Sequence, residues 1–166
     1  MATTITSPVT ELLQQHTIAF QVIEIPLSED SKPIRNLEEL LSAQGLDPAS
    51  VVRSVVFKGE TSGFCLLAVA GGGRADWALL RAHLNERKCR MADYDEVPEA
   101  TGYVVGAVPP VALPASLRVL VDNSVAGYEN VVIGSGVLGY ALALKSADLL
   151  KLLADKAQGS FVKADS

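Results

Sequence analysis

Cysteine, histidine and tryptophan are scarce in this chain of 166 residues, which has two, two and one of them. Cys65 and Cys89 lie in separate segments, so the sequence predicts neither a disulfide framework nor a cysteine metal site. Both are expected to be free thiols, buried or half-buried. His16 and His83 fall in predicted helices without a recognisable nucleophile elbow, so they are expected at the surface or between helices rather than as general bases.

Long apolar runs and an excess of positive charge are also missing. Hydrophobic residues make up 49% of the chain, but no apolar run approaches the roughly 18 residues of a membrane span. The first residues lack a basic segment followed by an apolar one, so no secretory signal is predicted and the cytoplasm is the expected location. The net charge of −5 argues against DNA and long phosphate backbones as partners, but allows docking to a short nucleic-acid end.

Local motifs for metal or nucleoside triphosphate chemistry are absent: HExxH, CxxC, Walker A and EF-hand spacings do not occur. The carboxylates around Asp93 to Glu99 cluster in what reads as a solvated turn. The length fits one domain over residues 1–166, without linkers or low-complexity tracts.

Hydrophobic periodicity predicts alternating helices and strands without strict βαβ order. Prolines in the segment YVVGAVPPVALP, residues 103–114, exclude a helix or a central strand there. These patterns favour an α/β fold, a single domain with a mixed, barrel-like β-sheet flanked by helices. Helices are expected over residues 10–16, 36–44, 76–85, 93–102 and from Ser146 as N-cap, and strands over 18–25, 51–58, 63–70, 89–92, 117–121, 130–133 and 140–144.

The segment VVIGSGVLG, residues 131–139, places glycines at positions 134, 136 and 139 directly after an apolar strand. Such glycines indicate positive φ angles or a close approach to the backbone. Three interpretations stay open: a turn with a packing role, a turn that also walls a ligand pocket, or a dinucleotide-binding G-x-G-x-x-G. The last lacks its context, because the motif lies near the C-terminus and an extended run follows instead of a helix.

Arg53 is unusual because it interrupts the apolar strand VVRSVVF. A guanidinium in such a strand must reach a partner, a ligand or solvent. Lys58, at the end of the same strand, is expected to be solvated.

Four segments of the chain, by their sequences and their order, resemble the YbaK family of aminoacyl-tRNA editing domains. They are VVRSVVFKG, TGYVVGAVPPVAL, LRVLVDNSV and ENVVIGSGVLGYALALKSADLLKLL. This family includes freestanding deacylases and the insertion domain of bacterial prolyl-tRNA synthetases. The resemblance implies hydrolysis of the ester between a wrong amino acid and the terminal adenosine of a tRNA, without a metal or an organic cofactor. It implies two partners, the aminoacylated tRNA acceptor end and an aminoacyl-tRNA synthetase, and no membrane.

The resemblance also implies the site. Its G-x-x-x-P loop, which shapes the amino-acid pocket, corresponds to Gly106, Ala107, Val108, Pro109 and Pro110. Arg53 and Gly106 are the expected catalytic residues. Backbone N–H groups of Gly134, Ser135 and Gly136 are expected to line the same cleft and to bind substrate oxygens.

Three positions depart from the family pattern. Arg53 replaces the functional lysine, Pro109 stands where serine is common, and Ile25 stands where some members carry a polar aromatic residue. The sequence therefore supports two hypotheses: a trans-editing deacylase for tRNA-Pro carrying a small wrong amino acid, and a catalytically silent module of the same fold that binds an aminoacyl end or an amino acid.

Overall fold

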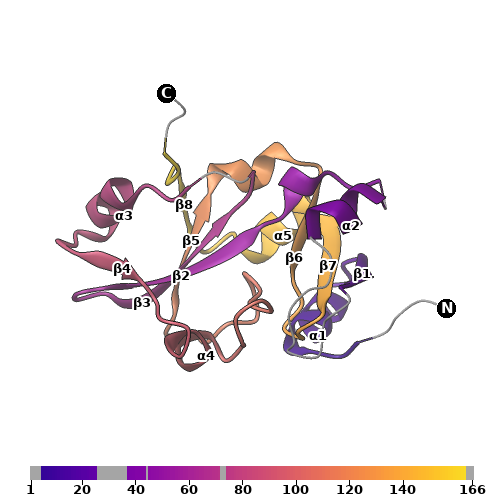
Figure 1. The fold of residues 1–166 in the computed structure, drawn as a ribbon, viewed down its shortest axis with the longest axis horizontal. Coiled ribbons are helices and arrows are strands. Elements are labelled where there is room, and N and C mark those ends of the chain that lie inside the picture. Colours follow the sequence, from indigo (N-terminus) through magenta and orange to yellow (C-terminus); the bar gives the residue numbers. More distant parts are fainter. Residues whose placement is uncertain (1–4, 26–36, 44, 72–73, 164–166) are drawn as a thin grey trace.

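The computed structural model describes residues 5–25, 37–43, 45–71 and 74–163, whose strands form two sheets flanked by helices (Figure 1). The three-stranded sheet has the order β1 (Phe20–Glu24), β7 (Tyr140–Lys145), β6 (Asn130–Gly134); the five-stranded sheet has the order β4 (Cys89–Met91), β2 (Arg53–Gly59), β3 (Gly63–Val69), β5 (Arg118–Asp122), β8 (Ala157–Gly159). The helices are α1 (Pro8–Gln15), α2 (Leu37–Ala43), α3 (Trp77–Leu84), α4 (Glu96–Thr101) and α5 (Ser146–Leu152), with 3-10 turns η1 (Pro48–Ser50) and η2 (Asn123–Gly127).

The two sheets meet where β2 begins. Val51 and Val132 form a parallel bridge, and the Val52 N–H donates to the Val132 carbonyl oxygen at 2.7 Å. The larger sheet is mixed, since β3 pairs antiparallel with β2 but parallel with β5. The predicted mixed α/β class is thus confirmed. The barrel-like closure is not found, because the strands of the described residues form two separate sheets joined at this bridge.

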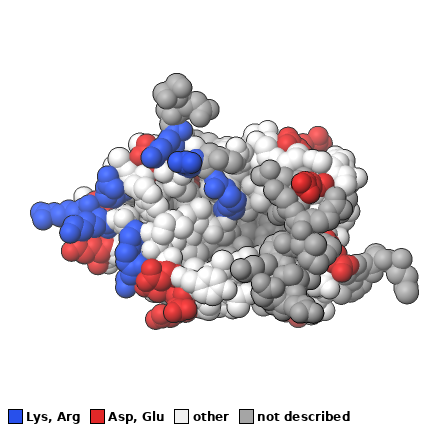
Figure 2. Space-filling view, viewed as in Figure 1, with Lys and Arg blue, Asp and Glu red and all other residues white. Residues whose placement is uncertain are grey.

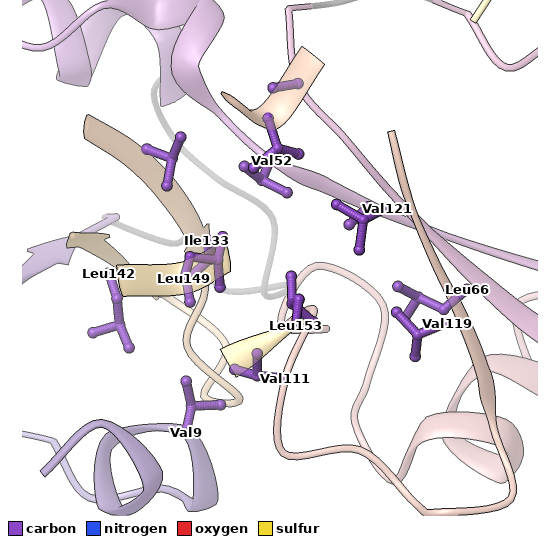
Figure 3. Close-up of a cluster of buried hydrophobic side chains, with 14 of the residues drawn as sticks. Val9, Val52, Leu66, Val111, Val119, Val121, Ile133, Leu142, Leu149 and Leu153 are labelled. Carbon is purple, nitrogen blue, oxygen red and sulfur yellow. The ribbon is translucent and has the colours of Figure 1, made fainter. Parts of the chain in front are cut away.

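A shared apolar core lies between the sheets (Figure 3). Val52 and Leu66 come from the larger sheet side, and Ile133 and Leu142 come from the smaller sheet. Residues on the opposite face of β2 belong to a second cluster, in which Phe57 is fully buried with Leu80 of α3. Val56 and Phe57 therefore bury opposite faces of the middle of β2.

Several expected elements are confirmed with shifted ends, while others differ. No helix or strand occurs in residues 103–114, as the prolines predict. Cys65 is buried and Cys89 half-buried, and both are free. Ser146 as N-cap is wrong: α5 has Lys145 at that position, and the Ser146 hydroxyl donates to the Tyr128 carbonyl oxygen instead.

The sequence analysis missed β8, which pairs parallel with β5. The turn after β8 is held by the buried carboxylate of Asp122, which accepts the Phe161 N–H at 2.7 Å and the Ser124 N–H at 2.9 Å. This carboxylate therefore ties the end of β5 to the segment that follows β8.

A bidentate ion pair between Arg90 and Glu96 stabilises the connection between β4 and α4. The Arg90 guanidinium donates to the two Glu96 carboxylate oxygens at 2.7 and 3.0 Å. One of those oxygens also accepts the Asp93 N–H at 2.8 Å. These bonds, led by the one from Arg90, lower the pKa of Glu96 from 4.5 to about 2.

This ion pair predicts a specific acid dependence of stability. Because the folded-state pKa of Glu96 lies below its unfolded value, the contribution is complete above pH 4.5 and is lost as the pH falls towards about 2. We expect the unfolding free energy of the wild type to fall more steeply over this interval than that of Glu96→Gln. Urea titrations at stepped pH measure both; parallel curves would contradict the assignment.

Candidate functional site

The loop Gly106–Pro110 packs directly on the end of β6. A methyl group at Gly134 would overlap the Val108 carbonyl oxygen and lie 2.7 Å from the carbonyl carbon. The Gly136 N–H donates to the Ala107 carbonyl oxygen at 2.9 Å. Two segments far apart in the sequence are therefore joined backbone to backbone, which only glycine at position 134 permits.

Positive φ angles explain two further glycines of these motifs. Gly106 has φ +96° and Gly136 has φ +85°, a region that L side chains rarely adopt. A side chain at Gly136 would also lie 2.9 Å from the ring of Tyr103, whose hydroxyl donates to the Ala112 carbonyl oxygen at 2.7 Å. Packing and backbone conformation thus account for the glycine motif, and the strand β7 follows it where a dinucleotide site would need a helix.

A cavity of about 550 Å³ lies between this loop, β2 and β6. Its volume is within the range of small-molecule sites. Most of its lining is aliphatic, and the polar side chains among its described lining residues are those of Arg53, Ser54, Tyr94 and Tyr140. We call it the main cavity; its lining residues are Ile25, Val51, Val52, Arg53, Ser54, Val55, Val56, Met91, Ala92, Tyr94, Val97, Val105, Gly106, Val108, Val132, Ile133, Gly134, Tyr140 and Ala141.

Arg53 and Ser54 bring polar chemistry to the cavity wall that β2 forms. Arg53 is the first residue of β2 and is exposed, so its charge remains in contact with water at the cavity mouth. The Ser54 hydroxyl is buried and has no hydrogen-bond partner among the described residues. An unpaired buried hydroxyl is costly, and this one belongs to a residue that lines the main cavity.

The structure brings five of the predicted site residues together and separates the others. Arg53, Gly106, Val108, Gly134 and Ile25 all line the main cavity. Ala107, Pro109 and Ser135 are buried beside it without lining it, while Pro110 lines another cavity of about 590 Å³ behind the loop.

Ser135 and Gly136 have structural partners instead of facing the main cavity. The Ser135 hydroxyl donates to the carbonyl oxygens of Val137 and Tyr140 at 2.9 and 2.8 Å. The Gly136 N–H is occupied by Ala107, so it is not open to a substrate oxygen as the sequence analysis expects. These residues hold the loop in place.

The sequence analysis missed Ser54 and the residues Met91, Tyr94 and Val105, which the fold adds to the cavity. Ser54 could have been found from its position, because a second polar residue directly after Arg53 also interrupts the apolar strand. Tyr94 carried no such signal, since its approach to the cavity depends on the pairing of β4 with β2.

The site is thus a mostly apolar cavity in an α/β domain, with the loop Gly106–Pro110 on one side of it. Comparison with known proteins identifies the class of this domain. A family model described as "Aminoacyl-tRNA editing domain" matches residues 31–152. The chain belongs to this family, in agreement with its resemblance to YbaK proteins.

Curated relatives of the chain include proline–tRNA ligases. The enzyme of Thermotoga maritima is 30% identical over 112 residues, covering 67% of this chain and 19% of the ligase. That of Kosmotoga olearia is 26% identical over 126 residues, covering 76% and 20%. The chain thus spans about a fifth of the length of these relatives.

A solved structure extends the similarity to almost the whole chain. It describes a proposed trans-editing enzyme for prolyl-tRNA synthetase, with 26% identity, a TM-score of 0.75, and coverage of 98% of this chain and 100% of the other. Among the described residues, no helix has the length and apolar character that a membrane crossing requires.

The contact between Gly134 and the loop predicts a stability difference between two glycines. Gly134→Ala should lower the unfolding free energy by about 2 to 3 kcal/mol, because the new methyl group overlaps a fixed backbone. Gly127→Ala is the matched control, since nothing lies within 4 Å of its added methyl group. Thermal and urea denaturation measure both, and equal stability of the two variants would contradict the close packing.

Proposed function

We propose that this chain hydrolyses mischarged aminoacyl-tRNA, with tRNA-Pro carrying a small wrong amino acid as its substrate. Membership of the editing family supports the reaction class. The proline–tRNA ligase relatives and the structural neighbour support the tRNA. The observation that carries the proposal is the main cavity, where Arg53, Ser54, Gly106 and Gly134 surround one ligand-sized space.

Arg53 is suited to hold the terminal nucleotide. A guanidinium stays protonated and offers paired N–H donors to a phosphate or to ribose oxygens. Its exposure at the cavity mouth leaves it where the nucleotide enters, while the amino acid continues inward. In this role Arg53 supplies the positive charge and the hydrogen-bond donors that the family's lysine would supply.

The cavity walls favour a small, uncharged amino-acid side chain. Val56, Val97, Val108 and Ile133 offer only aliphatic contacts. A charged side chain would lose its hydration there without gaining a partner, whereas alanine would not. Ser54 adds a hydroxyl that has no partner among the described residues, and we propose that it turns to bind a polar atom of the ester or of the amino acid.

The hydrolytic nucleophile in this proposal is water or the neighbouring ribose hydroxyl. No histidine, cysteine, aspartate, glutamate or lysine occurs among the described residues that line the cavity. The protein then acts by positioning the ester and by hydrogen bonding to the charge that develops on it, rather than by forming a covalent intermediate.

The alternative is a module that binds the aminoacyl end without hydrolysing it. Arg53 favours it, because a guanidinium is planar and delocalised and differs from a compact ammonium in how it places its charge. The two functions require the same cavity but differ in turnover.

The deciding experiment follows hydrolysis of a panel of mischarged tRNAs by the wild type, Arg53→Ala and Arg53→Lys. We expect wild-type turnover of alanyl-tRNA-Pro and a loss of at least tenfold in kcat/KM on Arg53→Ala, from the loss of a charge-assisted hydrogen bond of about 1.5 to 3 kcal/mol. No wild-type turnover of any ester, together with a gain on Arg53→Lys, would exclude the enzyme and leave the binding module.

Ser54→Ala should change stability and activity in opposite directions. Removing an unpaired buried hydroxyl raises the unfolding free energy by about 1 kcal/mol. The loss of its bond to substrate lowers kcat/KM about fivefold, for a net hydrogen bond of about 1 kcal/mol. Denaturation and deacylation assays on the same preparation test this; a parallel loss of stability and activity would show a purely structural hydroxyl.

A further inference from the structure

Basic residues gather at the end of the molecule that holds α3, β4 and the β2–β3 hairpin (Figure 2). They surround a groove of about 530 Å³. Five of the 14 Lys and Arg residues of an otherwise acidic chain line it, against one carboxylate, that of Glu60. We call this the basic groove; its cations are Lys58, Arg81, Arg87, Lys88 and Arg90.

Hydrogen bonds join the two sides of the basic groove, the β2–β3 hairpin and the segment between α3 and β4. The Glu86 carboxylate accepts the Thr61 N–H at 2.8 Å, and the Glu60 N–H donates to the Lys88 carbonyl oxygen at 3.2 Å. Glu86 is thereby bound to the hairpin rather than offered to a ligand. Arg90 is paired with Glu96, while Arg87 and Lys88 are exposed on the connection between α3 and β4.

An exposed apolar shelf lies at the mouth of the main cavity. Tyr94 is 72% exposed, Met91 52% and Val105 39%, although all three line the cavity. Large apolar side chains with this much exposure are unusual in a group, and such a group marks an interaction site. We call these three residues the shelf.

Strand β4 connects the shelf to the basic groove. Cys89 and Arg90 line the groove, and the next residues of the chain, Met91 and Ala92, line the main cavity. Cavity, shelf and groove therefore adjoin one another along β4, and we call this succession the path.

We propose that this path holds the single-stranded 3′ end of the RNA, which deepens the proposed function and rests on it. The terminal adenosine enters the main cavity, the preceding base stacks on Tyr94, and the phosphates beyond it follow the basic groove. A charged groove that tracks the backbone beside an aromatic stacking surface is the physical design of single-strand binding. Because Tyr94 is 72% exposed, its ring is accessible to the base that precedes the terminal one.

The test compares two esters: full-length alanyl-tRNA-Pro, and alanyl-adenosine, which reaches only the main cavity. Equilibrium binding of deacylated tRNA-Pro, followed by fluorescence anisotropy, adds a readout that needs no hydrolysis. The variants are Tyr94→Ala, Tyr94→Phe and the double variant Arg87→Ala/Lys88→Ala. The matched controls are Leu79→Ala, another exposed apolar residue, and Lys145→Ala/Lys151→Ala, two exposed cations outside the groove.

We expect Tyr94→Ala to raise KM for the tRNA and to weaken tRNA binding roughly tenfold, the effect of losing one stacked base. Tyr94→Phe restores both values, because it keeps the ring. The double variant lowers the slope of log affinity against log salt by about 1.4, two single-strand phosphate contacts at about 0.7 each. Hydrolysis of alanyl-adenosine stays at the wild-type rate in Arg87→Ala/Lys88→Ala, because neither residue lines the main cavity. In Tyr94→Ala it falls less than hydrolysis of the tRNA ester does.

The outcomes separate the proposed path from the proposed function. If the wild type hydrolyses both esters and the variants bind and hydrolyse the tRNA like the controls, the path is wrong and the function stands. If the wild type hydrolyses neither ester, the function is wrong, and the binding data alone decide the path. If deacylated tRNA does not bind, the path is overturned, and an acidic protein segment becomes the better occupant of the groove.

Discussion

The backbone contact between Gly134 and the Ala107–Val108 segment is the constraint on which the candidate site depends. The loop lacks helix or strand pairing, so its conformation must be set by tertiary contacts. Gly134 allows the approach, the Gly136 N–H donates to the Ala107 carbonyl oxygen, and the Tyr103 hydroxyl holds the loop at Ala112. One wall of the main cavity is therefore held in place by backbone contacts that two glycines permit.

The opposite wall depends on where β2 begins. Val52 bonds to Val132 and joins the two sheets just before Arg53, so the first residues of β2 lie at the junction rather than in the middle of a sheet. Farther along, both faces of the strand are covered by core residues. The junction thus places the polar residues Arg53 and Ser54 at the cavity, and Val55 and Val56 after them give it an aliphatic wall.

The sequence predicted most of the elements and the motifs of the site, because glycine, proline and apolar periodicity act locally. It failed where the outcome depends on distant partners. Ser146 has the side chain of an N-cap, but the carbonyl oxygen of Tyr128 competes for its hydroxyl. The strand β8 has little apolar pattern of its own and exists through pairing with β5.

The site shows the same division between local and distant effects. The glycine motif indicated a close approach, but its partner at Val108 could be known only from the fold. Gly136 and Ser135 looked like ligand-binding groups because their hydrogen-bond partners lie elsewhere in the chain or in the folded turn. Tyr94 and Met91 were overlooked because strand pairing, not sequence position, brings them to the cavity.

Arg53 gives the cavity mouth a planar, delocalised cation. A lysine ammonium is a compact point charge with three donors, whereas a guanidinium offers five N–H donors in a rigid fork. Attraction for an anionic ligand at this point is therefore directional. A phosphate or carboxylate that binds two of these donors at once is fixed in orientation as well as in position.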